Sequence, residues 1–344
     1  MTSVISGIGW HVIGASMAAS FYAPIERVKQ WSWETTWAIA GLFSWILLPI
    51  GVSLVFLPSF HDFYAAMGAS LLIRVAFFGA MWGVGNVSYG LTMRYLGMSL
   101  GIGVAIGVTL IVGTLVPPVM HGQATTLFTT QSGLMTVAGV LVAVIGVAVV
   151  SWAGHLKEFQ LRGQLAEFNV GLGLLLAVLC GIFSSGMSFA IDAAQPMQAA
   201  AVSVGVKPLY SALPSYVIIM GGGAIVNLAY CFLRLAVLPR LSLRADLHQP
   251  RPILVKNALL ASTGGVMWYL QFFFYAWGAA NIPQHLFYVN WMLHMSIYVL
   301  CGSLVGLALG EWKGVNYRAL RLLWAGVVII IAAANLVGLG MVTR

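Results

Sequence analysis

Long apolar runs separated by short polar segments dominate this sequence. Two stretches contain no Asp, Glu, Lys or Arg: the 62 residues from Tyr95 to Leu156 and the 54 residues from Asn257 to Gly310. A membrane-spanning helix needs about 20 apolar residues, so each stretch has room for two spans and a turn. The pattern predicts an all-α, polytopic membrane protein.

Charge-poor windows of this kind divide the whole chain into ten predicted spans. They are Val4–Ala23, Thr35–Leu57, Val75–Met93, Met98–Pro118, Leu134–Gly154, Gly171–Ile191, Ala212–Leu233, Asn257–Ala280, Phe287–Ala308 and Leu322–Met341. Composition agrees, because 7% of the residues are charged, whereas a soluble domain carries about 25%. The three cysteines lie inside apolar runs and predict neither a disulfide framework nor a metal site.

The basic residues orient the predicted bundle. If the N-terminus lies outside the cell, thirteen of the sixteen Lys and Arg residues fall on the cytoplasmic side, and only Arg74, Lys207 and Arg344 remain outside. Such a bias is the usual signal of topology in membrane proteins. It therefore explains the net charge of +8 without nucleic acid as a partner. With ten spans, both termini are expected to be periplasmic.

An internal repeat relates the two halves of the sequence. The matched pairs are Gly79 with Gly265, Met81 with Met267, Trp82 with Trp268 and Tyr89 with Tyr275 at an offset of 186, and Ser16 with Ser184, Ser20 with Ser188 and Phe21 with Phe189 at an offset of 168. We expect two five-helix repeats, residues 1–154 and 168–344, joined by a cytoplasmic linker at 155–167. Because five is odd, the second repeat must be inverted, as in many secondary transporters.

Three polar and aromatic stripes within the spans are candidates for a binding cavity. Their members are Trp82, Asn86 and Tyr89 in the third span, Trp268, Gln271 and Tyr275 in the eighth, and Asn290, His294 and Tyr298 with the adjacent Trp291 in the ninth. Within each stripe the spacing places the residues on one helical face, apart from Trp291, which is adjacent to Asn290. Interhelical hydrogen bonding and ordinary aromatic packing are the competing explanation. Two stripes at equivalent repeat positions favour a cavity at the membrane midplane.

The chemistry of these stripes limits the substrate. They hold no cluster of Arg or Lys for an anion and no acidic ring for a cation. Aromatic planes with neutral donors and acceptors suit a polyhydroxy molecule, whose hydroxyls bond to the amides and whose C–H faces stack on rings. Motifs for ATP hydrolysis, metalloprotease zinc or dithiol chemistry are absent from the sequence, so no cofactor and no metal are expected.

His11 and Glu34 are the candidates for proton coupling. Histidine is the natural proton carrier near neutral pH, and the first two spans are otherwise poor in titratable groups. The alternatives are a hydrogen-bonded packing residue for His11 and an acid favoured by the helix dipole for Glu34. His294 is the reserve candidate.

Unusual strings along nearly the whole chain resemble the L-rhamnose–proton symporter family, within the drug/metabolite transporter superfamily. They are FYAP (Phe21–Pro24), WSWET (Trp31–Thr35), GAMWGVGN and YGLTMRYLGMS (within Gly79–Ser99), IGVTLIVGTL (Ile106–Leu115), CGIFSSGMSFA (Cys180–Ala190), ALPSYV (Ala212–Val217), MGGGAI (Met220–Ile225), MWYLQFFFYAWG (Met267–Gly278) and WMLHMS (Trp291–Ser296). The resemblance implies a ten-helix fold of inverted repeats, uptake of L-rhamnose with a proton, and a bacterial inner membrane. One departure is Asp192, where the family pattern usually has a neutral amide, which makes Asp192 a weaker candidate for the proton carrier.

Three other functions remain open from the residues alone. The first is a same-fold exporter or exchanger of another neutral metabolite. The second is an integral-membrane enzyme such as a lipid-linked sugar transferase, although the loops are short and acid-poor for such a site. The third is a channel, which a closed midplane site disfavours. No obligate protein partner is evident, so the expected partners are the sugar, protons and the lipid bilayer.

Overall fold

The computed structural model describes residues 2–96, 98–162, 169–238, 241–283, 287, 289–308, 310 and 312–342. All regular structure in this part is helical, and it contains ten segments long and apolar enough to cross a membrane, as predicted. The spanning elements are α1 (Thr2–Ser20) with α2 (Tyr22–Ile25), α3 (Trp33–Gly41) with η1 (Leu42–Leu47) and α4 (Leu48–Phe56), α6 (Ala69–Leu96), α7 (Met98–Met120), α9 (Gln131–Arg162), α10 (Val170–Ser184) with α11 (Gly186–Ala193) and α12 (Gln195–Ser203), η2 (Pro208–Tyr210) with α13 (Ser215–Val237), α15 (Arg251–Ala280), α16 (Val289–Ala308) and α17 (Tyr317–Val342). Short helices α5 (Phe60–Ala65), α8 (Ala124–Thr129) and α14 (Leu243–Leu247) lie between spans.

Several helices extend beyond their predicted spans. Helix α6 begins at Ala69 rather than Val75, and α9 continues past Gly154 to Arg162. The added ends include charged residues such as Arg74 and Lys157, which are compatible with a helix but not with the hydrocarbon core. A change from apolar to charged sequence therefore marks where the membrane ends, not where the helix ends.

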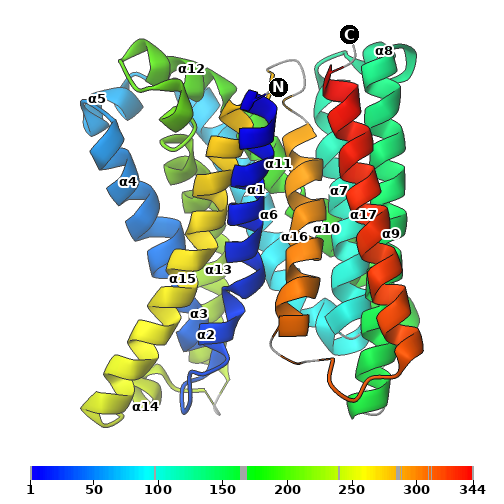
Figure 1. Ribbon diagram of the computed structural model, residues 1–344. Coiled ribbons are helices and arrows are strands. Elements are labelled where there is room, and N and C mark those ends of the chain that lie inside the picture. The colour runs from blue at the N-terminus through cyan, green and yellow to red at the C-terminus, as the bar shows by residue number, and fades with distance from the viewer. Residues whose placement is uncertain are drawn as a thin grey trace.

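The helices stand side by side as one bundle with two distinct ends (Figure 1). The start of α1, the end of α17 and the short helix α8 lie at one end, here called the terminal end. Helices α2 and α14 lie at the other, here called the α14 end. The predicted linker at 155–167 falls partly outside the described residues, as do Arg240 and Arg344 of the orientation argument.

Close backbone approach joins the two halves of the chain. On α6, a Cβ atom at Gly79 would collide with the carbonyl oxygen of Ile219 on α13. The reverse holds for Gly222 on α13, whose added Cβ would collide with the carbonyl of Ala76. In a membrane, where helices gain little from leaving lipid, such small residues allow the van der Waals packing that holds helices together.

The second span is not one regular helix, because η1 forms a π-helical turn in its middle. Gly41, Trp45, Pro49, Ser53 and Leu57 are buried at intervals of four residues. An α-helix advances by about 100° per residue, so four residues overshoot a full turn by about 40° and the buried stripe would drift around it. The wider π turn absorbs part of this drift and keeps these side chains facing the bundle.

Candidate functional site

A fully buried histidine on α1 lies against the polar residues of α16. The Nε2 atom of His11 is 3.0 Å from Oδ1 of Asn290, and the His11 and His294 ring centroids are 5.6 Å apart. The Asn290 amide nitrogen donates to the carbonyl of Phe287 over 2.8 Å, which leaves its oxygen to accept from His11. Neutral His11 therefore carries its proton on Nε2, and Nδ1 is an acceptor.

Helix α15 completes this group with Tyr275. Its ring centroid lies 5.2 Å from those of both His11 and His294, and 6.3 Å from that of Trp291. The Trp291 indole N–H donates to the carbonyl of Thr109 over 3.1 Å, which anchors α16 to α7. We call the set His11, Tyr275, Asn290, Trp291 and His294 the central cluster. It brings one predicted proton-coupling residue together with four predicted sugar-binding residues.

Space for the central cluster depends on a glycine. A Cβ atom at Gly278 would lie 2.7 Å from Nε2 of His11, well inside van der Waals contact. The imidazole therefore lies flat against the backbone of α15, one turn beyond Tyr275. Any larger residue at position 278 would displace the histidine from Asn290.

Several buried polar atoms beside or within the central cluster lack partners among the described residues. They are Nδ1 of His11, both ring nitrogens of His294 and the amide nitrogen of Gln271. Gln271 lies one turn before Tyr275 on α15 and is buried. Unpaired polar groups inside a membrane protein are costly, so they are retained where a ligand or proton uses them. The region can thus offer both donors and acceptors to a polar solute.

The third-span stripe does not join the central cluster. Trp82 and Trp268 instead contact Phe272 from two sides, with ring centroids 6.0 and 6.2 Å away. In the described part of the chain, no hydrogen bond or ring contact connects Asn86 or Tyr89 with the cluster. The two tryptophans therefore pack around Phe272, and their place in the sugar site stays a prediction. The buried amide nitrogen of Asn86 and the buried indole nitrogen of Trp268 have no partner among the described residues.

Glu34 occupies a different site at the α14 end. It lies in the first turn of α3, is buried, and accepts from Nε of Arg234 on α13 over 3.1 Å. Next to it, the hydroxyls of Ser32 and Thr35 donate to Oδ2 of Asp246 over 2.5 and 2.6 Å. These bonds tie the start of α3 to α13 and α14, and we call them the α14-end clasp. The sequence predicted the position of Glu34 in its helix but neither Arg234 nor Asp246 as a partner.

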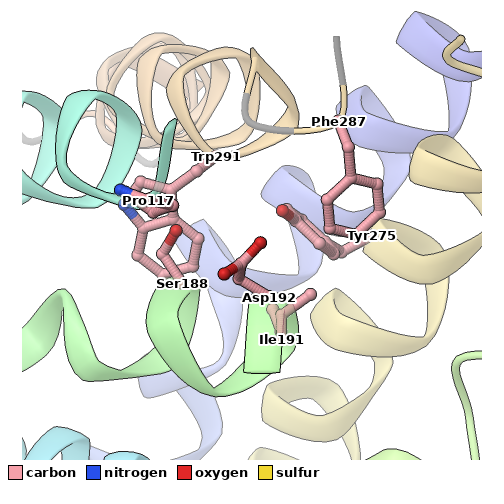
Figure 2. Close-up of a pocket in the computed structure, with 7 residues that line it drawn as sticks. All are labelled: Pro117, Ser188, Ile191, Asp192, Tyr275, Phe287 and Trp291. Atoms are coloured by element: carbon pink, nitrogen blue, oxygen red, sulfur yellow. The ribbon is translucent and has the colours of Figure 1, made fainter. Parts of the chain in front are cut away.

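A small cavity lies beside Tyr275 and Trp291 of the central cluster, and it has room for about one water molecule. Its lining residues are Pro117, Ser188, Ile191, Asp192, Tyr275, Phe287 and Trp291, and we call it the Asp192 cavity (Figure 2). Only Tyr275 and Trp291 belong to the predicted site. Two further lining residues carried a signal in the sequence, because the repeat pairs Ser188 with Ser20 and because Asp192 departs from the family pattern.

Comparison with known proteins gives one consistent result. The family model described as L-rhamnose-proton symport protein matches residues 1–343. The L-rhamnose-proton symporter of Pectobacterium atrosepticum is 60% identical over 338 residues, covering 98% of both chains. That of Klebsiella pneumoniae strain 342 is 59% identical over 339 residues, again covering 98% of both. With ten apolar spans in the part of the chain that the structure describes, this is a multi-pass protein of the bacterial inner membrane. The chain belongs to the L-rhamnose–proton symport protein family.

Proposed function

We propose that this protein imports L-rhamnose together with a proton by alternating access. The observation that carries the proposal is the hydrogen bond between His11 and Asn290 within the buried central cluster. It couples a side chain able to bind a proton to side chains suited to a sugar. The names of relatives about 60% identical agree with this chemistry.

The sugar-binding part of the proposal rests on neutral polar groups among aromatic rings. Gln271, Asn290 and His294 supply donors and acceptors, while Tyr275 and Trp291 supply apolar faces. A neutral deoxysugar offers hydroxyls for the former and C–H faces for the latter. A membrane enzyme does not fit a family of symporters, and an exporter or exchanger remains the alternative that transport direction must test.

The coupling part of the proposal assigns His11 as the proton carrier and Glu34 as the group that assists proton release. A neutral sugar cannot respond to the membrane potential, so accumulation requires a co-transported ion. His11 belongs to the central cluster and contacts Asn290 and His294, so a change in its protonation would alter the sugar site. Glu34 lies at the α14 end, away from the central cluster, and forms an ion pair with Arg234 there.

The packing of the helices supports two inverted repeats. Helix α1 packs on α15 and α16, and its proposed counterpart α10 packs on α6 and α7, the counterparts of α15 and α16. Helix α1 starts at the terminal end, whereas α10 starts at the α14 end (Figure 1). Alternating access then requires one repeat to rock against the other around the central cluster.

The proposed orientation places the terminal end in the periplasm and the α14 end, with its basic residues, in the cytoplasm. A reporter enzyme that is active only in the periplasm should work when it is fused after Arg344, because both termini would lie outside. The measurement is reporter activity in intact cells, with a cytoplasm-only reporter at the same position as control. Activity of the cytoplasmic reporter would overturn this topology.

Gln271→Ala and Asn86→Ala should each weaken L-rhamnose binding by roughly 5- to 150-fold. The estimate is the loss of about 1–3 kcal/mol when a hydrogen bond is removed and its partner stays unpaired. Isothermal calorimetry on the purified proteins measures the effect.

Asn335→Ala is the matched control for these two amides. Asn335 bonds only to the carbonyl of Ile331 on its own helix among the described residues, at an exposed position. It should bind the sugar like the parent. If Gln271→Ala and Asn86→Ala also bind like the parent, the assignment of both amides to the sugar site is wrong.

Uptake of labelled L-rhamnose into proteoliposomes tests the function as a whole. An inward proton gradient should drive accumulation, and collapse of the gradient should reduce uptake to equilibration. Accumulation that does not depend on the proton gradient would contradict the proposed proton coupling. Transport in the outward direction only would favour the exporter.

A further inference from the structure

Asp192 is the one carboxylate that lines the Asp192 cavity. It lies on α11, one residue before that helix ends, and its side chain is 20% exposed. Figure 2 shows the carboxylate pointing into the space in front of Tyr275 and Trp291. The carboxylate of Asp192 therefore faces two members of the central cluster.

Two neighbours hold this carboxylate in place. Nε2 of His121, just after α7, is 2.7 Å from Oδ2, and the Gln195 amide donates to Oδ1 over 2.7 Å. A carboxylate offers about four lone-pair directions, so roughly two remain for other donors. Because both oxygens are already fixed, the remaining acceptor directions are set before a ligand arrives.

The surroundings of the remaining acceptors match a sugar more closely than a cation. Aromatic faces of Tyr275, Phe287 and Trp291 line the same cavity, together with the Ser188 hydroxyl. The Ser188 hydroxyl donates to the carbonyl of Gly113 over 2.5 Å, so toward the cavity it can act only as an acceptor. Carboxylate acceptors beside aromatic rings suit hydroxyl donors on a ring with apolar faces.

We propose that Asp192 binds the transported sugar, its carboxylate accepting hydrogen bonds from two hydroxyls while the sugar ring lies against Tyr275 and Trp291. The inference rests on the proposed function and adds a recognition residue to it. The present cavity is too small for a monosaccharide, so entry requires α7 and α11 to separate. His121 and Asp192 connect these two helices, and the sugar would meet them first at the terminal end.

Asp192→Ala should weaken L-rhamnose binding by about 10- to 150-fold, because hydrogen bonds to a charged acceptor are stronger than neutral ones. Asp192→Asn should fall between this variant and the parent, since the amide retains one acceptor oxygen. Calorimetry on the purified full chain measures both. Asp62→Ala is the matched control, because Asp62 is an exposed acid outside the spans and should leave binding unchanged.

Analogues that lack one hydroxyl separate sugar contact from a merely structural role. The parent should lose affinity for the 2-deoxy or the 3-deoxy analogue of rhamnose, and Asp192→Ala should lose the same preference. His121→Ala, which removes only the neighbour, should keep it. If Asp192→Ala still discriminates like the parent, Asp192 does not contact the sugar. If the parent itself binds no rhamnose, the proposed function fails instead.

Discussion

Proteoliposomes containing His11→Gln should fail to accumulate L-rhamnose, while exchange of internal for external sugar continues. Moving one proton inward is worth about 2.3 kcal/mol per 100 mV, or roughly 50-fold accumulation at one proton per sugar. Glutamine can still donate to Oδ1 of Asn290 but cannot bind a proton near neutral pH. The variant should therefore equilibrate the sugar, and its accumulation ratio should fall from about 50 to about 1.

A matched control for His11→Gln is the same substitution at a histidine that lies outside the spans and the central cluster. His61 on α5 is suitable, because its side chain is 92% exposed and its described partner is the neighbouring Asp62. His61→Gln should accumulate the sugar like the parent under the same gradient. Should His11→Gln do so as well, His11 is not the carrier, and His294 becomes the candidate to examine next.

Glu34→Gln should also abolish accumulation of L-rhamnose, because it removes the charged carboxylate at the α14 end. The amide can still accept from Arg234, so the local hydrogen bond survives while the charge is lost. Without a carboxylate there, a proton leaving the central cluster has no base to receive it on the proposed exit side. The expected accumulation ratio is again about 1 under an imposed proton gradient. Sugar binding measured by calorimetry should persist, because Glu34 has no described contact with the central cluster.

The variant Arg234→Gln distinguishes two roles of Glu34. Glu34 either transfers the proton or only holds the α14 end together through its ion pair with Arg234. If Glu34 acts only through its ion pair, both substitutions remove the pair and should affect uptake alike. If Glu34 handles the proton, Arg234→Gln should keep gradient-driven accumulation, although its rate can change. Glu26→Gln serves as the control, since Glu26 is an exposed acid near the same end of the bundle. Equal loss in Arg234→Gln and Glu34→Gln would assign Glu34 to the clasp alone.

Local pattern predicted the spans well because membrane helices satisfy their own backbone hydrogen bonds. Each span is encoded within about 20 residues, and charge marks its limits. All five residues of the central cluster were candidates from the sequence, four for the sugar and His11 for the proton, and Asn290 and His294 lie one turn apart on α16 and are both buried. Its combination with His11 was not predicted, because that contact joins residues 279 positions apart.

The same reasoning explains what the sequence could not show. A stripe on one helical face indicates which side is buried, but not which neighbour it meets. The stripes of Trp82 and Trp268 therefore could not predict that both rings pack against Phe272. Asp192 was a weaker candidate for the proton carrier because the family pattern usually has a neutral amide at that position, and only the neighbouring helices place it before Tyr275 and Trp291.

The π turn in the second span has a mechanical consequence for the α14 end. A π turn holds one more residue than an α turn, so it breaks the regular register of the helix. The segment that bears Glu34 is therefore rotated relative to α4, compared with its position in a continuous α-helix. The extra residue thus helps to set the direction from which Glu34 meets Arg234, while Pro49 and Ser53 stay buried in the bundle.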